Sequence, residues 1–502
     1  MPITTENITL EVYDGFPPAA RQLYTTMADT DLVKAIMEET GITIEFVHIP
    51  EGEDGHVFLN TMIASDSLPD IVRGDFDNYP GGAAGAMNDG VIINATDLIN
   101  EYAYYYNAIL DEQGAEVRRM VMDDEGRYRF FGHSFQTEYM NGTPGFGFIA
   151  RKDMIEEMGI EKLPVTFDEF EVMLDGFLEK GITPWAPSFS TESYTNHAPV
   201  ASAFGVRHND FQLRDGKIVF SRTLPEYKDY LAKMNEWLNK GYYTMDAFTD
   251  SEEDSQKKFQ AGSVGLTQTY SDDVITYQSV GQAADPNFKV TGLSLPRVNA
   301  EDVLTTYNGV NVLDPGTQGK FITHSCEHPV EAVRFIDYLY RPETRMMCSW
   351  GVNTDERTIW EEDADGNRSW SSFMTDNPEV DFETNSDRYT YRAFTEMTDE
   401  NMQKIKYGTP EVQQAWEQWI YNANKSDIMP AEAYFTYTSD EMKETAALMS
   451  EISTFSDEMV AKFIAGQESL DNFDAFVEQL EAMGISRVCE IKQSAYDKYM
   501  AR

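Results

Sequence analysis

Residues 143–178, TPGFGFIARKDMIEEMGIEKLPVTFDEFEVMLDGFL, are the stretch that decides the fold. Gly145 to Ala150 form a short apolar run among glycines, which predicts a buried strand. The following RKDM begins a helix that Gly159 ends, because glycine tolerates the left-handed end of a helix. Thr166 predicts a second helix, since its hydroxyl can accept the backbone N–H of Glu169 while that carboxylate reaches back. This helix carries apolar residues at helical spacing, so one face must pack on a core: Phe170, Met173, Leu174, Phe177 and Leu178.

The same stretch resembles the signature of the family 1 extracellular solute-binding proteins, which are the sugar receptors of bacterial ABC importers. RKD, the helix-ending glycine, Pro164 and TFDEF occur here in the family's register. Further similar segments begin at residues 67, 259, 329 and 462: SLPDIV, FQAGSVGL, PVEAVRFIDYLYRPETRMM and KFIAGQESLDNFDAFVEQLEAMGI. The last segment is similar to the ending of the long lipoprotein branch, so the resemblance covers most of the chain.

This resemblance implies an α/β protein with the type II periplasmic-binding-protein fold. Its two lobes would be discontinuous in sequence, with hinge crossings near Phe135 and Val303 and a helical C-terminal extension. The division that we expect is 1–134 plus 303–350 in lobe 1, and 135–302 plus 351–502 in lobe 2. The length favours two lobes independently, because single cores stop growing at roughly 250 to 300 residues and this chain has 502.

The charge and the hydropathy pattern limit the partners. The net charge of −47 is spread along the chain, whereas nucleic-acid binding needs a basic stripe. No apolar run approaches the roughly 18 residues of a membrane span. The N-terminus has neither a basic segment nor an apolar signal core, so we expect that a leader was removed. The resemblance implies an extracellular, cell-surface lipoprotein of a bacterium, or a periplasmic protein in a Gram-negative one, that is a monomer and whose lipid anchor is absent from this chain.

The N-terminal segment predicts the first ligand positions. Ile8 to Val12 and Ile42 to Val47 alternate as strands around a helix from Ala28 to Glu39, which is a βαβ unit. Ligands of parallel sheets bind outside the carboxyl ends of the strands. The loops at Asp14 and at Asp75 to Tyr79 are therefore candidates, with solvated loop acids as the open alternative.

Aromatic residues outside the periodic apolar stripes are the second group of candidates. Sugar rings stack their C–H faces on aromatic rings, and their hydroxyls need polar partners. Trp185 lies in the proline-punctuated loop GITPWAPSFS, and Trp350 precedes the helix-ending Gly351. Trp237, by contrast, repeats at helical spacing and is expected in the core. Ordinary packing remains open for every candidate ring. The full set of predicted ligand residues is Asp14, Asp75, Tyr79, Phe135, Trp185, Tyr270, Ser271, Tyr307, Asn308 and Trp350.

The sequence matches several motifs of catalysis or cofactor binding only in part. Gly145 to Ala150 spells a dinucleotide fingerprint, but its glycines lie within the strand. The segment around Ser134 lacks the second glycine of a nucleophile elbow.

Outside these motifs, a second capping box is expected at Thr223 and Glu226. We predict no cofactor and no catalytic residue.

Metal and disulfide signals are equally incomplete. His324, Cys326 and His328 have no second ligand cluster at a zinc spacing. Asp363 begins a calcium-loop pattern in which Arg368 occupies the glycine position. Some relatives that bind acidic polysaccharides carry a calcium loop between the two helices of the opening stretch, and its absence here speaks against an alginate-like ligand. A bridge between Cys326 and Cys348 is left open.

The function that we expect is therefore capture of an oligosaccharide between two lobes and delivery to the permease subunits of an ABC importer. The alternatives are a polysaccharide-active enzyme, either a glycosidase or a lyase, and a carbohydrate adhesion module without transport. The abundance of carboxylates leaves the enzyme alternative open, because with 86 acidic residues some pair will lie near any cleft.

Overall fold

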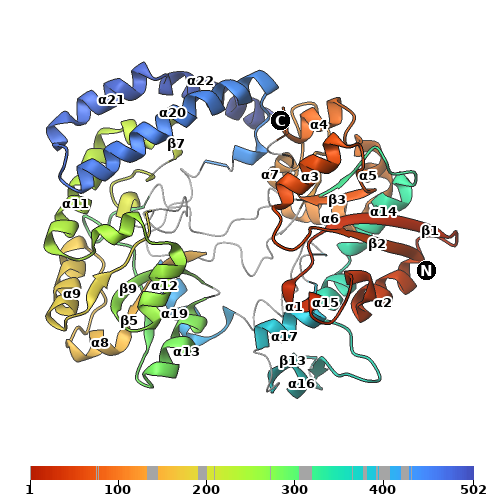
Figure 1. The fold of residues 1–502 in the computed structure, drawn as a ribbon, viewed down its shortest axis with the longest axis horizontal. Helices are drawn as coiled ribbons and strands as arrows, with labels where there is room; N and C mark the ends of the chain where they lie inside the picture. The colour runs from red at the N-terminus through yellow and green to blue at the C-terminus, as the bar shows by residue number, and fades with distance from the viewer. Residues whose placement is uncertain are drawn as a thin grey trace.

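The computed structural model shows two α/β lobes side by side, each built on its own sheet (Figure 1). It describes residues 2–74, 76, 79–132, 145–189, 200–208, 210–271, 273–304, 319–364, 366–376, 382–391, 394, 407–419, 429–430 and 432–502. The expected two-lobed α/β architecture is confirmed. Four predicted ligand residues lie outside the described residues, as does the crossing near 135: Asp75, Phe135, Tyr307 and Asn308.

Lobe 1 contains a five-stranded sheet in the order β2-β1-β3-β11-β4. Its strands are β1 (Ile8–Asp14), β2 (Ile42–His48), β3 (Ile71–Gly74), β4 (Phe131–Gly132) and β11 (Gly319–Ile322). The first three are parallel, and β11 runs antiparallel to β3 and β4. Helix α2 (Asp31–Thr40) joins β1 to β2, so the predicted βαβ unit is confirmed.

Helices cover both faces of this sheet (Figure 1). They are α1 (Pro18–Arg21), α3 (Gly55–Ala64), α4 (Gly82–Asn88), α5 (Thr96–Tyr102), α6 (Tyr104–Gln113), α7 (Ala115–Met120), α14 (Pro329–Leu339) and α15 (Pro342–Trp350). Residues far apart in sequence share one core, in which Leu10, Ile36 and Phe335 are all fully buried. Lobe 1 is therefore discontinuous.

Lobe 2 contains a four-stranded sheet in the order β10-β5-β9-β6. Its strands are β5 (Phe146–Arg151), β6 (Thr183–Trp185), β9 (Val264–Tyr270) and β10 (Val290–Leu293), and a separate hairpin pairs β7 (Phe211–Arg214) with β8 (Lys217–Phe220). The helices are α8 (Lys152–Glu157), α9 (Phe167–Glu179), α11 (Pro225–Lys240), α12 (Glu252–Gln260) and α13 (Val274–Ala284). The opening stretch thus provides β5, α8 and α9 in the predicted order.

The ends of two helices test the capping predictions. The reciprocal bonds between Thr166 and Glu169 are present at the start of α9, which confirms that capping box. The box predicted at Thr223 is wrong, because Pro225 starts α11 and Leu224 is its cap. The Thr223 hydroxyl instead donates to the carbonyl of Phe220. Trp237 is fully buried, as expected.

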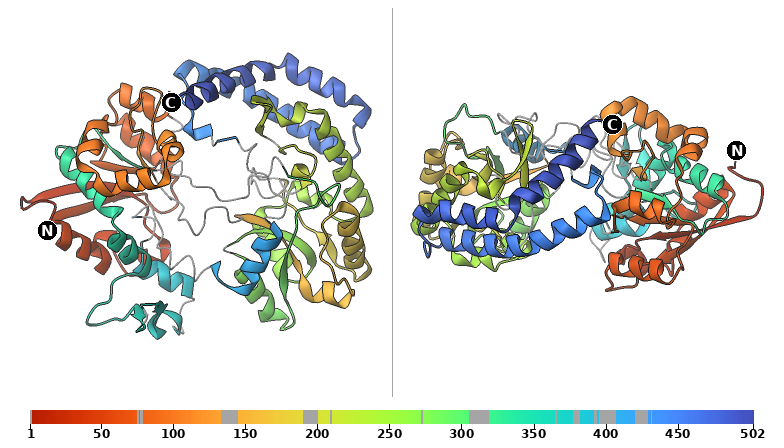
Figure 2. Two further views of the ribbon diagram at one scale, coloured as in Figure 1. Left: turned by 180° about the vertical axis from the view of Figure 1, so that it is seen from behind. Right: turned by 90° about the horizontal axis from the view of Figure 1, so that it is seen from above.

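Long helices at the C-terminal end pack on lobe 2, which confirms the helical extension. Helix α19 (Pro410–Trp419) lies on the sheet, and α20 (Ser439–Ile464), α21 (Phe473–Ala482) and α22 (Ile485–Met500) share a core with α9 and α11. Seen from above, α20 and α22 run from lobe 2 towards lobe 1 (Figure 2). None of the helices within the described ranges is long and apolar enough to span a membrane.

The described part of 352–394 packs on lobe 1, although we expected it in lobe 2. It contains β12 (Trp360–Glu362), β13 (Arg368–Trp370), α16 (Ser372–Thr375) and α17 (Phe382–Tyr389). Tyr391 and Phe394 belong to the lobe 1 core, and Arg357 pairs with Asp31 of α2. The expectation took 350 as the boundary, whereas these aromatic side chains continue the lobe 1 core beyond it. The other boundaries stay a prediction.

Candidate ligand-binding site

The carboxyl ends of β1 and β3 point towards lobe 2, and α1 lies beside them (Figure 1). Asp14 is the last residue of β1 and is 1% exposed. Its Oδ1 lies 3.3 Å from Nη1 of Arg73 on β3, and it accepts the N–H of Gly15 at 2.7 Å. Asp14 was expected in the loop after the strand, but the strand continues to this residue and its carboxylate is buried. Its role as a ligand residue stays a prediction.

A buried lysine lies behind this ion pair. Lys320 on β11 is 1% exposed, and its Nζ donates to the carbonyl of Phe394 at 2.9 Å. Burial lowers the pKa of Lys320 from 10.5 to about 7, although Asp14 opposes this and Arg73 adds to it. Nearby, the Tyr391 hydroxyl donates to the carbonyl of Gly15 at 3.0 Å. This edge of lobe 1 is thus a network of largely buried charges and hydrogen bonds, in which Oδ2 of Asp14 has no hydrogen-bond partner among the described residues.

His48, the last residue of β2, completes the lobe 1 edge. Its ring lies between Phe16 and Phe46, with centroids 4.5 and 5.1 Å away. Nε2 lies 3.2 Å from the backbone N of Met27, which can only donate, so Nε2 accepts. The proton therefore resides on Nδ1 and is donated to the carbonyl of Asp14 at 3.2 Å. Burial lowers the pKa of His48, in accord with this neutral form.

The facing edge of lobe 2 is formed where β5 begins and β9 ends. Phe146 pairs directly with Tyr270, and their rings form an edge contact at 6.1 Å. Tyr270 is 41% exposed, so much of its ring is open to solvent. Ser271 is buried, and its backbone N–H donates to the carbonyl of Gly145 at 2.8 Å. The structure thus brings Tyr270 and Ser271 together at this edge.

Trp185 was expected to lie outside the core, and this premise is wrong. Its loop is the edge strand β6, parallel to β9, with Trp185 opposite Leu266. The side chain is 1% exposed and lies 5.8 and 5.9 Å from Phe148 and Trp237. The pairing of β6 turns the ring into the lobe 2 core, which no local pattern indicated.

Trp350 was placed outside the core on the same reasoning, and that premise is wrong too. It is the last residue of α15 and has no exposed surface. Trp370 lies 4.8 Å from its ring, on the hairpin in which Trp360 pairs with Trp370. The packing of the β12–β13 hairpin over Trp350 was not foreseen.

Tyr79 lies in lobe 1 ahead of α4. It is partly buried, its ring meets Phe76 at 6.2 Å, and its hydroxyl donates to Asp89 at 3.0 Å. The nearby residues 81–84 form one wall of a cavity of 320 Å³. The structure therefore places Tyr79 beside this cavity wall and does not bring it to the end of β9.

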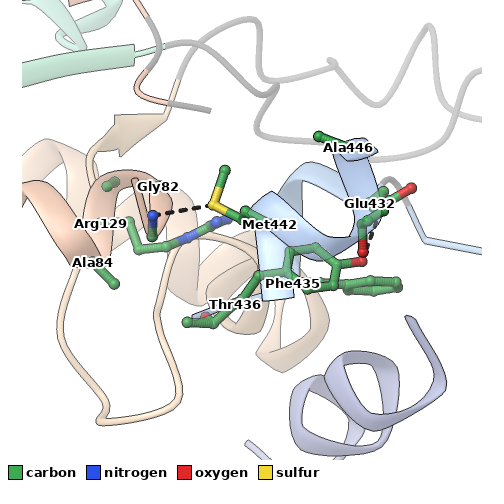
Figure 3. A pocket seen from close by; sticks show the side chains of 12 residues that line it. Gly82, Ala84, Arg129, Glu432, Phe435, Thr436, Met442 and Ala446 are labelled. Carbon is green, nitrogen blue, oxygen red and sulfur yellow. Dashed lines mark hydrogen bonds between the residues drawn. The ribbon is translucent and has the colours of Figure 1, made fainter. Parts of the chain in front are cut away.

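The cavity lies between lobe 1 and the C-terminal extension (Figure 3). The backbone N–H of Gly81 contacts Sδ of Met442 at 3.1 Å, and the Arg129 guanidinium lies over Tyr434 at 5.8 Å. Glu432 is engaged by Lys492 and by the hydroxyl of Tyr437. Apolar and backbone groups dominate the walls, so this is a contact between lobe 1 and the extension and offers no catalytic pair.

The metal candidates have other partners. Nε2 of His324 lies 3.0 Å from Asp66, and Asp363 accepts the backbone N–H of Asn367 at 2.8 Å in the β12–β13 turn. The described ranges contain no group of three His, Cys, Asp or Glu that could hold a metal ion. Cys326 and Cys348 are both free, so the bridge left open is not formed.

Sequence reasoning missed the residues that organise the lobe 1 edge. Arg73 forms an ion pair with Asp14, and Lys320 interacts with Asp14 through its charge. Both basic residues stand in short apolar strands, in PDIVRG and GKFITH. A basic residue inside such a strand is a signal in itself, because buried cations are retained where they are paired. The pairing across two distant segments could not be read from the sequence.

Two discontinuous lobes with facing strand ends define the class of two-lobed binding proteins. Residues 25–346 match the family model of the bacterial extracellular solute-binding proteins. The match covers more than half of the chain, and this protein belongs to that family. A relative from Streptococcus pneumoniae serotype 4 is the fructooligosaccharide ABC transporter substrate-binding protein FusA, which is 22% identical over 94% of this chain and 87% of its own length.

Solved structures show the same fold over nearly the whole chain. The S. pneumoniae FusA in complex with kestose has a TM-score of 0.72 at 19% identity, covering 98% of this chain and 99% of that one. A human-milk-oligosaccharide (HMO) binding solute-binding protein from Bifidobacterium longum infantis has a TM-score of 0.75 at 15% identity, with the same coverage. The alginate-binding protein AlgQ2 without calcium ion has a TM-score of 0.72 at 19% identity, covering 99% of both chains.

Proposed function

We propose that this protein captures an oligosaccharide between its two lobes and passes it, chemically unchanged, to the permease subunits of an ABC importer. The observation that carries the proposal is the full-length match to solute-binding proteins named for oligosaccharides, with fructooligosaccharides and human-milk oligosaccharides among them. Membership of an extracellular family accords with a site outside the cytoplasm. A lipid anchor and a monomeric state are parts of the same proposal.

The geometry supports binding of a sugar at the facing strand ends. An aromatic ring that is 41% exposed at the end of an inner strand, as Tyr270 is, offers a face for a sugar ring. A two-lobed protein with discontinuous lobes can close over such a ligand by rotation at the connecting segments. A ligand held between the lobes would contact both edges.

The enzyme alternative is weaker at this place. A general acid or base must reach the substrate, but Asp14 is buried and held by Arg73. His48 is also engaged at both ring nitrogens. Asp14 and His48 therefore lack the access to a substrate that glycosidic cleavage requires.

The test is calorimetry with kestose, nystose, maltotriose, xylotriose, chitotriose and lacto-N-tetraose, followed by chromatography of each sugar after long incubation. We expect saturable binding of at least one sugar and recovery of that sugar intact. Shortened products would establish an enzyme, and the absence of binding to every sugar would contradict the proposal. Uptake of the bound sugar, lost on deletion of the gene, separates transport from adhesion.

A matched pair of tyrosine variants locates the site. Tyr270→Ala removes the exposed ring at the end of β9 and should weaken binding by about 1 to 3 kcal/mol, or roughly one to two decades in Kd. Tyr104→Ala removes a ring that is 75% exposed on α6 and should leave Kd unchanged. Equal effects of the two variants would move the site away from β9.

A further inference from the structure

Strand β9 has an unusual composition for its position. It is an inner strand, with β5 on one side and β6 on the other, and six of its seven residues are buried. Yet its middle reads Thr267, Gln268, Thr269. Gln268 stands directly opposite Phe148 of β5, which has no exposed surface. A large amide therefore occupies a place where an apolar side chain would pack.

The amide of Gln268 is buried without compensation. Neither Oε1 nor Nε2 has a hydrogen-bond partner among the residues that the structure describes. Buried amides in folded proteins nearly always have partners, because the desolvated group is otherwise destabilising. An unpaired amide that persists in a sheet therefore points to a partner that the free protein lacks.

Gln212 shows what a structural buried glutamine looks like in the same lobe. It lies on β7 and is 2% exposed. Its Oε1 accepts from the backbone N of Arg207 at 3.0 Å and from the hydroxyl of Ser221 at 2.7 Å, and its Nε2 donates to the carbonyl of Gly205 at 3.0 Å. Every polar atom of this amide is used, in contrast to that of Gln268.

The location of Gln268 indicates the partner. It precedes Tyr270 by two residues, so both side chains lie on the same face of the sheet. The pair Phe148–Gln268 is thus the next same-face pair inwards from Phe146–Tyr270 at the edge. Exposure falls from 41% at Tyr270 to 8% at Gln268, which places the amide just beneath the surface. A ligand reaches the amide through a side-chain rearrangement at this end of the strand, and rotamer changes of exposed side chains take place within nanoseconds.

We propose that Gln268 is a ligand-contacting residue that receives two neighbouring hydroxyls of the sugar unit stacked on Tyr270, an inference that rests on the proposed function. A primary amide presents an acceptor and two donors side by side. A pair of adjacent ring hydroxyls presents the complement, with one hydroxyl donating to Oε1 and the next accepting from Nε2. The subsite therefore selects a polyhydroxylated ring with an unmodified pair of adjacent hydroxyls.

The test compares Gln268→Leu with Gln212→Leu by calorimetry and thermal unfolding of the full chain. The probe is the sugar that the wild-type protein binds most tightly among kestose, nystose, maltotriose, xylotriose, chitotriose and lacto-N-tetraose. Leucine has nearly the volume of glutamine but no polar atoms. We expect Gln268→Leu to raise Kd by about 10-fold or more while Tm stays equal or increases, because an unpaired amide has been removed. Gln212→Leu should lower Tm and leave the Kd of the folded protein unchanged.

The possible outcomes separate the inference from the function. If the wild-type protein binds a sugar and Gln268→Leu binds it with unchanged Kd, the inference is overturned while the proposed function stands. A lower Tm for Gln268→Leu with unchanged Kd would likewise assign Gln268 to the fold alone. If the wild-type protein binds no sugar, the proposed function fails and the inference fails with it. Should Gln268→Leu not fold, Gln268→Met provides the same comparison with a more flexible side chain.

Discussion

At the residue scale, the charged groups of the lobe 1 edge interact mainly with one another and with the surrounding fold. Asp14, Arg73 and Lys320 come from β1, β3 and β11 and interact at this edge, where Asp14 and Lys320 are buried and Arg73 is 16% exposed. A buried cation is disfavoured by desolvation unless partners compensate it, and the lowered pKa of Lys320 shows that burial outweighs Asp14 here. The acid–base behaviour of this edge is therefore linked to folding.

Lys320 makes stability depend on pH in a defined direction. Its folded-state pKa of about 7 lies below its ordinary value of 10.5. Between these values the unfolded chain binds more protons than the folded one, so this residue makes stability rise with pH, and its penalty is complete below about pH 7. Lys320→Met should therefore reduce the rise in unfolding free energy between about pH 7 and about pH 9, measured by urea unfolding. The substitution retains the neighbouring side chains of Cys348 and Arg73, so the change in pH dependence is due to Lys320.

The control for this measurement is Lys462→Met on α20, where the lysine is 40% exposed beside Glu458. Its pH dependence should follow that of the wild-type protein. A Lys320→Met variant with the wild-type slope would show that Lys320 is not the origin of the effect.

At the element scale, two strand glycines explain how α19 lies on the lobe 2 sheet. A Cβ at Gly147 of β5 would meet the Trp419 ring at 2.6 Å, and one at Gly292 of β10 would meet the Ala415 Cα at 2.3 Å. The absence of side chains lets the Trp419 indole donate to the carbonyl of Phe148 at 2.8 Å. Gly147, one of the glycines that match a dinucleotide-binding motif in the sequence, thus allows α19 to pack on the sheet.

Gly147→Ala should therefore destabilise lobe 2. The added methyl displaces Trp419, and overpacking of this kind costs about 1 to 3 kcal/mol. Chemical unfolding monitored by tryptophan fluorescence measures the change. Gly74→Ala on β3 is the matched control, because a Cβ there meets no atom within 4 Å, and it should change the unfolding free energy by less than about 0.5 kcal/mol. Equal stability of the two variants would contradict the packing role of Gly147.

At the scale of the whole molecule, the chain visits each lobe twice and its C-terminal end touches both. Within the described ranges, the lobe 1 core contains residues from 3–131 and 321–394, and the lobe 2 core contains residues from 146–304 and 429–499 together with Met120 of α7. The guanidinium of Arg502 donates to Asp124 at 2.8 Å and to the carbonyls of Met122 and Tyr434 at 2.6 and 2.9 Å. These hydrogen bonds at the end of α22 thus connect the extension to lobe 1 beside the cavity in Figure 3.

Ligand binding should bring the two lobes together. Closure about the connecting segments buries the sugar between the two edges, as in hinge-type binding proteins. Small-angle X-ray scattering with a saturating concentration of the bound sugar should give a smaller radius of gyration than the free protein. An unchanged radius, with binding established by calorimetry on the same sample, would count against closure.

The sequence by itself determined the family, the α/β class, the order of β5, α8 and α9, and the burial of Trp237. These features depend on local patterns, namely capping pairs, helix-ending glycines and apolar spacing, which residues close together in the chain carry in full. The helical extension, which the family resemblance implied, is present as α20, α21 and α22.

Only the tertiary structure decided which polar and aromatic residues stand at the lobe edges. Trp185 and Trp350 look free in the chain, but the pairing of β6 and the packing of the β12–β13 hairpin bury them. Asp14 was located at the correct strand end, yet its partner Arg73 lies 59 positions away in the chain. The unpaired amide of Gln268 is visible only when every neighbour is known. Exposure and pairing are properties of contacts between distant segments, and no local pattern encodes them.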